Sequence, residues 1–234
     1  MKNGYHSFCC PLLLQGRLFC RCLMTVRRLI VAWHLITTNH LPFHIQVRQL
    51  RHALKNIDIV HVRDKEASLQ RLKQQIDQLC KIGLRREQII LNEHVEAATA
   101  WDLGGVHLPG NSSWTGTDVK EKAPKLRVGA SVHNREEAIA RADENVDYLY
   151  FGHVYPSASK PDSSPRGLEA LQSVVQSVEI PVFAIGGITR DRLREISRIG
   201  ASGIALISGF WEADKPEDEA VQFNRFGQMS YETT

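Results

Sequence analysis

The chain alternates between strand-like and helix-like segments along nearly its whole length, and this alternation is what most limits its fold. Each short apolar segment is followed by a stretch with helical spacing or by a polar connection. The strand-like segments are Ile30–Thr38, Ile57–Arg63, Ile89–Asn92, Gly105–Leu108, Arg127–Val132, Asp147–Val154, Val182–Ile188 and Gly203–Ser208. Strands that alternate with helices predict a parallel sheet, because each helix returns the chain to the same end of the sheet.

The segments between these strands carry helix signals of different strength. Leucine and isoleucine recur at helical spacing over residues 69–79, and Gly83 then ends the helix as a C-cap residue. Asn134 followed three residues later by Glu137 is typical of a helix start. Residues 111–122 carry only weak helix signals. A final helix is expected near 216–226.

Eight strands and eight crossovers in about 200 residues fit a single (β/α)8 TIM barrel of the α/β class, at the short end for that fold. A doubly wound open sheet is the alternative, since its strands also end in glycine or polar residues. The count of eight and the glycines after the last two strands favour the closed barrel. We assign the barrel to residues 29–234.

The first 28 residues differ from the rest of the chain. Residues 1–29 hold five basic and no acidic residues, so the formal net charge of +3 becomes −2 for the remainder. The apolar runs in this segment are too short to span a bilayer and lack a clean signal-peptide core. We interpret residues 1–28 as a poorly structured extension or a mis-started stretch with the true start at Met24. A basic presequence is the alternative.

Charge and cysteine use restrict the partners and the compartment. A body of charge −2 has no basic footprint for nucleic acid, and no segment predicts contact with a membrane. Only Cys80 lies in the body, because the other four cysteines fall in the N-terminal segment, where no zinc-finger spacing occurs. A single thiol of this kind is typical of a reducing compartment, so we expect a cytoplasmic protein.

Glycines after the last two strands predict a phosphate site. Gly186 and Gly187 follow the seventh strand, and Ser208 and Gly209 follow the eighth. Loops at these two positions of a barrel often bind phosphate, because glycine lets backbone N–H groups approach the oxygens. A tight turn without a ligand is the structural alternative.

A histidine at the end of the fifth strand is the candidate acid–base group. Ser131 and His133 lie where that strand ends, at the mouth of the predicted barrel. Histidine takes and returns a proton near neutral pH, so His133 is suited to proton transfer. Its structural alternative is to cap the helix that follows.

Further polar side chains are expected at the same mouth. Arg63 ends the second strand and can bind both oxygens of a carboxylate, and Asn92 ends the third. Lys160 and Arg166 lie in a long polar loop after the sixth strand, where they could hold an anion or simply be solvated. His153 precedes that loop and could line the mouth of the barrel, but we expect it to be buried and hydrogen-bonded.

Taken together, these positions resemble the family of thiamine-phosphate synthases and thiazole tautomerases. The resemblance spans nearly all of residues 33–210, and its order and spacing are specific although no single motif is decisive. The matching stretches are Trp33–Thr37, Val60–Arg63, Gly105–Leu108, Gly129–His133, Asp147–Lys160, Pro181–Ile188 and Gly200–Gly209.

Departures from the synthase pattern indicate the tautomerase branch. The synthase requires Mg²⁺ and has Asn-Asp after the third strand and a further aspartate after the fourth. Here the first pair is Asn92-Glu93, and residues 108–113 supply no carboxylate. Because Mg²⁺ prefers carboxylates together with substrate phosphates, the loss of one acid argues against pyrophosphate chemistry. The tautomerase needs no metal, so we expect no metal and no cofactor.

The resemblance therefore implies an isomerase that aromatises a thiazole carboxylate phosphate in thiamine biosynthesis. His133 would move the proton, and the glycines after the last two strands would hold the phosphate. Arg63, Asn92, Ser131 and Lys160 would complete the binding site. The alternatives are a transferase, thiamine-phosphate synthase, and a non-catalytic regulator that binds the same phosphates. Barrels of this kind often pair, so a homodimer is one expected assembly.

Overall fold

The computed structural model of the chain describes residues 32–157 and 163–229. Eight parallel strands form a closed barrel in which every strand pairs with the next one in sequence and β8 pairs with β1. The barrel prediction is confirmed. The strands are β1 (Ala32–Ile36), β2 (Ile59–Val62), β3 (Ile89–Asn92), β4 (Gly105–Leu108), β5 (Arg127–Val132), β6 (Tyr148–Gly152), β7 (Val182–Ile185) and β8 (Gly203–Leu206).

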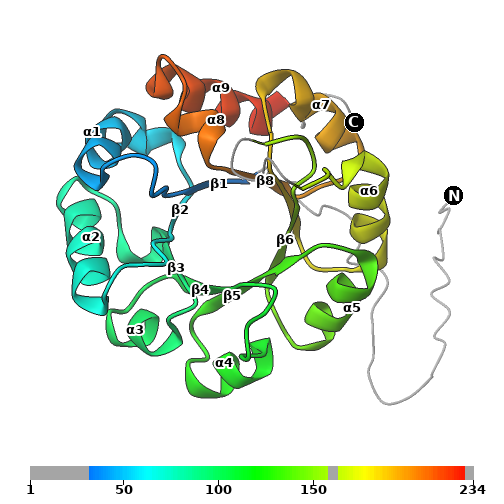
Figure 1. The fold of residues 1–234 in the computed structure, drawn as a ribbon, viewed down its shortest axis with the longest axis horizontal. Helices are drawn as coiled ribbons and strands as arrows, with labels where there is room; N and C mark the ends of the chain where they lie inside the picture. Colours follow the sequence, from blue (N-terminus) through cyan, green and yellow to red (C-terminus); the bar gives the residue numbers. More distant parts are fainter. Residues whose placement is uncertain (1–31, 158–162, 230–234) are drawn as a thin grey trace, which may run out of the picture.

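Helices surround this ring of strands, as Figure 1 shows in a view along the barrel. They are α1 (Phe43–Ala53), α2 (Leu69–Lys81), α3 (Val95–Ala100), α4 (Gly116–Lys122), α5 (Arg135–Asp143), α6 (Gly167–Ser177), α7 (Leu193–Arg198), α8 (Ser208–Trp211) and α9 (Pro216–Met229). The helix α9 packs against α1 and β1, so the end of the described chain covers its beginning.

Two hydrophobic clusters hold the fold together. The larger one lies between the strands and the helices, and it includes Leu35, Ile76 and Phe151, which are fully buried. The smaller one fills the inside of the barrel with Tyr148, Tyr150 and Phe183 among its members. The strands alternate between these two clusters because successive side chains point to opposite faces of the sheet.

The structure differs from the sequence expectations mainly at element ends. The poorly marked stretch 111–122 contains α4, which begins with a capping box between Thr115 and Asp118. After β7 the chain forms a 3-10 turn, Arg190–Arg192, which leads directly into α7. The short helix α8 was not predicted, because four residues are too few for helical spacing to be recognised.

Two expectations concern residues outside the described ranges. The proposed extension, residues 1–28, and the expected first residues of β1, Ile30 and Val31, lie outside the described residues. Lys160 falls in the gap between residues 157 and 163. Among the described residues, no helix combines the length and the apolar character that crossing a bilayer would require.

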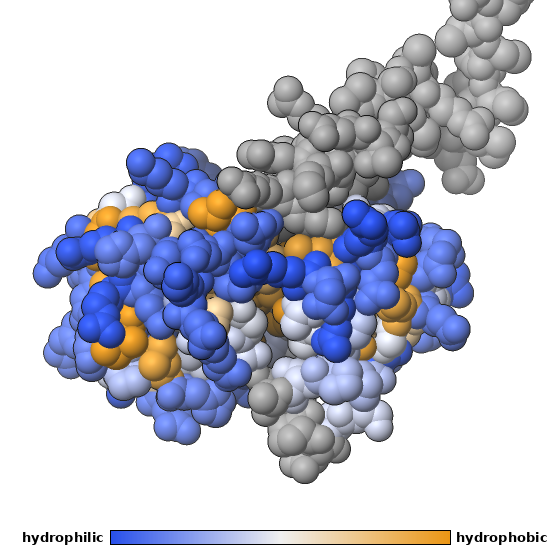
Figure 2. Space-filling model, turned by 90° about the horizontal axis from the view of Figure 1, so that it is seen from above, coloured by the Kyte–Doolittle hydropathy of each residue, from blue (hydrophilic) through white to orange (hydrophobic). Residues whose placement is uncertain are grey.

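The surface is largely hydrophilic on the face in Figure 2, where hydrophobic residues form small separated patches. This is usual for a barrel whose helices bury one apolar stripe against the sheet. The homodimer stays a prediction.

Candidate active site

A cavity of about 430 Å³ opens where the strands end. This volume lies within the range of small-molecule sites, and the position is where barrel enzymes carry their chemistry. The lining includes Thr37, Arg63, Lys65, Asn92, His107, Ser131, His133, Tyr150, Gly186, Gly187, Ser208 and Gly209. Of the candidate site residues in the described part of the chain, all but Arg166 therefore border this one cavity.

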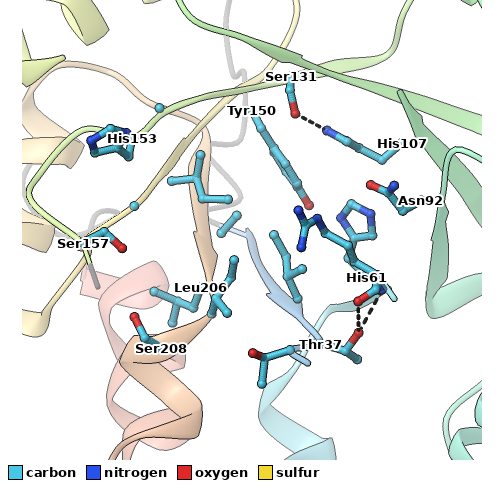
Figure 3. A pocket seen from close by; sticks show the side chains of 18 of the residues that line it. Thr37, His61, Asn92, His107, Ser131, Tyr150, His153, Ser157, Leu206 and Ser208 are labelled. Carbon is cyan, nitrogen blue, oxygen red and sulfur yellow. Dashed lines mark hydrogen bonds between the residues drawn. The ribbon is translucent and has the colours of Figure 1, made fainter. Parts of the chain in front are cut away.

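The loops after β7 and β8 provide free backbone donors at one side of the cavity. The amides of Gly187, Ser208 and Gly209 donate no hydrogen bond within residues 32–157 and 163–229. Unpaired N–H groups of this kind are suited to an anion such as phosphate. In Figure 3, Ser208 lies across the cavity from Asn92 and His107.

Glycine is required after β7 for a reason independent of any ligand. Gly186 and Gly187 have φ values of 95° and 65°, which other residues rarely adopt. A Cβ atom on Gly187 would lie 2.4 Å from the carbonyl oxygen of Pro156, and one on Gly186 would lie 2.2 Å from Cβ of His153. The glycines thus let the β7 loop pack tightly against the loop after β6.

His133 follows directly after β5 and borders the cavity with a partly exposed side chain. Its backbone N–H donates to Oε2 of Glu137 at 2.8 Å, and its Nδ1 lies 3.1 Å from the same oxygen. Glu137 belongs to α5, which begins at the N-cap residue Asn134 as predicted. The contact with Glu137 therefore holds the ring of His133 against the first turn of that helix.

Arg63 is held at its backbone and left unpaired at its side chain. Its N–H donates to Oγ1 of Thr37 at 2.9 Å, and that hydroxyl lies 3.3 Å from the carbonyl oxygen of Arg63. The guanidinium has no hydrogen bond or ion pair among the described residues. A cation without a carboxylate partner beside a cavity is available to an anionic ligand.

Buried rings form the floor of the cavity, as seen in Figure 3. The imidazole of His107 stacks on Tyr150 with 4.3 Å between ring centroids and lies 4.9 Å from the ring of His61. Nε2 of His107 is 2.8 Å from Oγ of Ser131. On the barrel axis below, Nδ1 of His34 is 2.5 Å from the hydroxyl of Tyr150.

These buried histidines are neutral. Burial lowers the pKa of His34 and of His61 to about 3. The charges of His61 and Arg127 lower the pKa of His34 further, and the charge of Arg63 lowers that of His61 further. At His61 the nearby Asn92 side chain acts in the opposite direction. Burial also lowers the pKa of His107 well below its ordinary value. The floor therefore binds through hydrogen bonds and ring contacts rather than through charge.

Of these three buried histidines, His61 has the fewest hydrogen-bond partners. Its side chain is buried, and neither ring nitrogen has a hydrogen-bond partner among the described residues. A buried polar group without a partner costs free energy, so its presence at the cavity floor needs a reason other than stability.

The residues after β3 and β4 do not fit a magnesium site of the synthase type. Asn92 borders the cavity, but the Glu93 side chain is exposed and is not part of the lining. The loop after β4 contributes Pro109, Gly110 and Asn111, which carry no carboxylate. In the described part of the chain, no group of three His, Cys, Asp or Glu side chains could hold a metal ion. The described residues therefore do not fit this metal.

Two basic or ionisable residues near the β6 loop have structural partners. Nε of Arg166 donates to the carbonyl oxygen of Gly152 at 3.1 Å, so Arg166 fixes the strand end and is not part of the cavity lining. His153 is buried, as predicted, with Nε2 3.1 Å from the carbonyl oxygen of Ser163, and it also borders the cavity. The role of Lys160 in substrate binding stays a prediction.

Sequence reasoning missed the floor of the site. His61, His107 and Tyr150 were not proposed as site residues, although each borders the cavity. The alternation within each strand contained the signal, since His61 faces opposite to Val60 and Val62. Inward-facing polar side chains near the ends of barrel strands are candidates for ligand contact.

Comparison with known proteins decides the family. The model described as "Thiamine monophosphate synthase" matches residues 33–210, which is most of the chain. The chain belongs to the thiamine monophosphate synthase family. This confirms the broader part of the resemblance seen in the sequence.

Several family members are similar over long stretches. A thiamine-phosphate synthase of Caldivirga maquilingensis is 35% identical over 168 residues, covering 71% of this chain and 82% of the relative. One from Pyrococcus furiosus is 43% identical over 124 residues, covering 53% of this chain and only 59% of the relative. The solved thiamine phosphate pyrophosphorylase of that organism has a TM-score of 0.75 at 32% identity, covering 87% of this chain and 98% of that chain.

The names of these relatives favour the transferase alternative over the tautomerase that the sequence departures indicated. All three are named as synthase or pyrophosphorylase. The family and the barrel are thus established, whereas the choice between the two reactions depends on the residues of the cavity.

Proposed function

We propose that this chain is a thiazole tautomerase, which aromatises a thiazole carboxylate phosphate by moving one proton. The observation that carries the proposal is the donor set of the cavity. It combines an acid–base residue, His133, with Arg63, whose guanidinium has no partner among the described residues. The loop after β4 supplies no carboxylate to complete a magnesium site. A proton shift needs an acid–base residue, and it needs no magnesium site.

The free amides after β7 and β8 support binding of the phosphate. Those of Gly187, Ser208 and Gly209 are the donors. Arg63 is proposed to meet the carboxylate, and the rings of the floor to contact the thiazole. This arrangement holds the substrate at two charged ends with the reacting ring between them.

The chemistry proposed for His133 is balanced within one substrate. The imidazole removes a proton from a saturated ring carbon and returns a proton to another carbon of the same molecule, so no other atom is gained or lost. Formation of the aromatic ring drives the reaction. The enzyme therefore has only to orient the substrate and to carry the proton.

Turnover of the non-aromatic substrate tests this proposal directly. The purified chain is mixed with the unaromatised thiazole carboxylate phosphate, and the absorbance of the aromatic ring is followed. We expect turnover without added metal and a loss of about a hundredfold or more in His133→Ala. His52→Ala, an exposed position on α1, is the matched control. Equal rates for His133→Ala and the wild type would exclude the proposed role.

Thiamine-phosphate synthase is the second candidate, because the similar relatives carry that name. It would join a pyrimidine pyrophosphate to a thiazole phosphate. Incubation of both substrates with Mg²⁺ and measurement of thiamine phosphate decide between the two reactions. Rapid synthesis with no tautomerase activity would replace the proposal, and tight ligand binding without either activity would favour a regulator.

A further inference from the structure

The carboxylate of Glu137 is fixed by the start of helix α5. The backbone N–H of Glu137 donates to Oδ1 of Asn134 at 2.8 Å, and Nδ2 of Asn134 donates to Oε1 of Glu137 at the same distance. One oxygen of the carboxylate is thus held by the N-cap residue. This is a variant of the capping arrangement in which side chain and backbone satisfy each other.

The other oxygen of Glu137 is directed at His133. Oε2 accepts the backbone N–H of His133 at 2.8 Å and lies 3.1 Å from Nδ1 of its ring. A carboxylate can only accept hydrogen bonds, so this contact requires a proton on Nδ1. In the neutral ring, Nε2 is then the nitrogen with the free lone pair.

Gly110 packs near the same edge of the ring. A Cβ atom placed on Gly110 would lie 3.2 Å from Cε1 and 3.6 Å from Nδ1 of His133. The Nδ1–Cε1 edge of the ring therefore rests near a backbone that carries no side chain. Nε2 makes no hydrogen bond among the described residues, and the residue borders the cavity.

We propose that Glu137 is a positioning residue that holds His133 as the Nδ1–H tautomer, so that Nε2 accepts the substrate proton. The inference builds on the proposed function of His133 and adds the group that determines which nitrogen reacts. A helix-capping role alone would explain the bond to Asn134, but it would not require Oε2 to accept from two groups of His133. The arrangement follows the general logic of a base oriented by a third group.

The tautomer can be measured without any substrate. Nitrogen NMR of the ¹⁵N-histidine-labelled full chain at about pH 8.5 distinguishes a protonated from an unprotonated ring nitrogen. The signals of His133 are assigned by their loss in His133→Ala. We expect Nδ1–H in the wild type and in Glu137→Gln, whose side-chain oxygen can still accept. We expect a shift toward Nε2–H, the form that free imidazole prefers, in Glu137→Ala.

Glu136→Ala is the matched control. Glu136 lies in the same first turn of α5, is exposed, and makes no described contact with His133. Both alanine variants remove one acidic residue from the helix start, but only Glu137→Ala should change the tautomer. An unchanged Nδ1–H signal in a folded Glu137→Ala would overturn the inference, as would a shift of equal size in Glu136→Ala.

Kinetics then separate positioning from substrate binding. With the thiazole substrate, we expect Glu137→Ala to lower kcat by about tenfold or more with little change in KM, and Glu137→Gln to recover part of the loss. A change confined to KM would contradict the positioning role. Absence of tautomerase activity would reject the proposed function. The role of Glu137 in setting the tautomer would still be tested, because the NMR result does not depend on turnover.

Discussion

Nε2 of His107 lies 2.8 Å from Oγ of Ser131, and Nδ1 of the same ring lies 3.3 Å from the hydroxyl of Tyr148. One buried ring thus links the ends of β4 and β5 to the interior of β6. Both ring nitrogens of His107 are satisfied without charge, which fits its strongly lowered pKa. Ser131 is therefore part of the support of the cavity floor as well as of its lining.

Removal of this hydroxyl should destabilise the barrel. In Ser131→Ala, one nitrogen of His107 loses its partner inside the protein, so we expect a cost of about 1–2 kcal/mol in the free energy of unfolding. Urea unfolding measures it. If the hydrogen bond is responsible, Ser131→Ala should cost much less in a His107→Leu background; an equal cost in both backgrounds would contradict this explanation.

Acid should destabilise the protein through its buried histidines. The folded pKa values of His34 and His61 are about 3, and that of His107 is also well below the ordinary value. Below about pH 6.5 the unfolded chain binds protons that the folded chain does not, so stability falls as the pH falls. At pH 5.5 the loss is about 1.4 kcal/mol for each histidine. Urea unfolding at pH 7.5 and 5.5 tests this expectation.

His61→Leu should stabilise the protein, whereas His34→Leu should destabilise it. Neither nitrogen of His61 has a hydrogen-bond partner in the part of the chain that the structure describes. Its replacement by an apolar side chain should therefore raise stability by about 1 kcal/mol at pH 7.5. It should also reduce the loss between pH 7.5 and 5.5 by about 1.4 kcal/mol. His34→Leu is the comparison, because it leaves the hydroxyl of Tyr150 without its partner and should destabilise. A destabilised His61→Leu would indicate a hydrogen bond that the structure does not contain.

Gly187→Ala should lower the stability of the protein much more than Gly167→Ala, although both glycines have a positive φ. Gly167 has a φ of 81° with no atom within 4 Å of an added Cβ, whereas at Gly187 the added Cβ would meet the carbonyl oxygen of Pro156. We expect Gly167→Ala to cost about 1–2 kcal/mol from backbone strain alone. Gly187→Ala should exceed this by about 1–3 kcal/mol, the range for overpacking. Equal melting temperatures for the two variants would show that the β7 loop has room to move.

Arg63→Ala should weaken binding of the phosphorylated thiazole carboxylate. A charge-assisted hydrogen bond contributes about 1.5–3 kcal/mol, so we expect Kd to rise by about tenfold to a hundredfold. Arg63→Lys should retain part of the affinity, because lysine keeps the charge but not the paired donors. Isothermal titration calorimetry measures both. Unchanged binding of the carboxylate in Arg63→Ala would remove Arg63 from the site.

The sequence predicted the barrel because strand and helix periodicities are local, and it predicted the cavity rim because residues after parallel strands meet at one end. Arg63, Asn92, Ser131 and His133 were found in this way, and all border one cavity. The contact between His133 and Glu137 could not be predicted, because Glu137 was recognised only as part of a helix start. The ring contacts of His61, His107 and Tyr150 depend on how strands far apart in sequence converge on the barrel axis.

Closure of the barrel has a consequence for synthesis of the chain. The strand β1 pairs with β8, and Nε1 of Trp211 donates to the carbonyl oxygen of Ile36 at 2.7 Å. While the ribosome has not yet released Gly203–Leu206, one edge of the first strand has no neighbour from its own barrel. An unpaired edge of this kind invites pairing with other chains. A nascent chain that stalls before the eighth strand should therefore depend on chaperones, even though most of its residues have already been made.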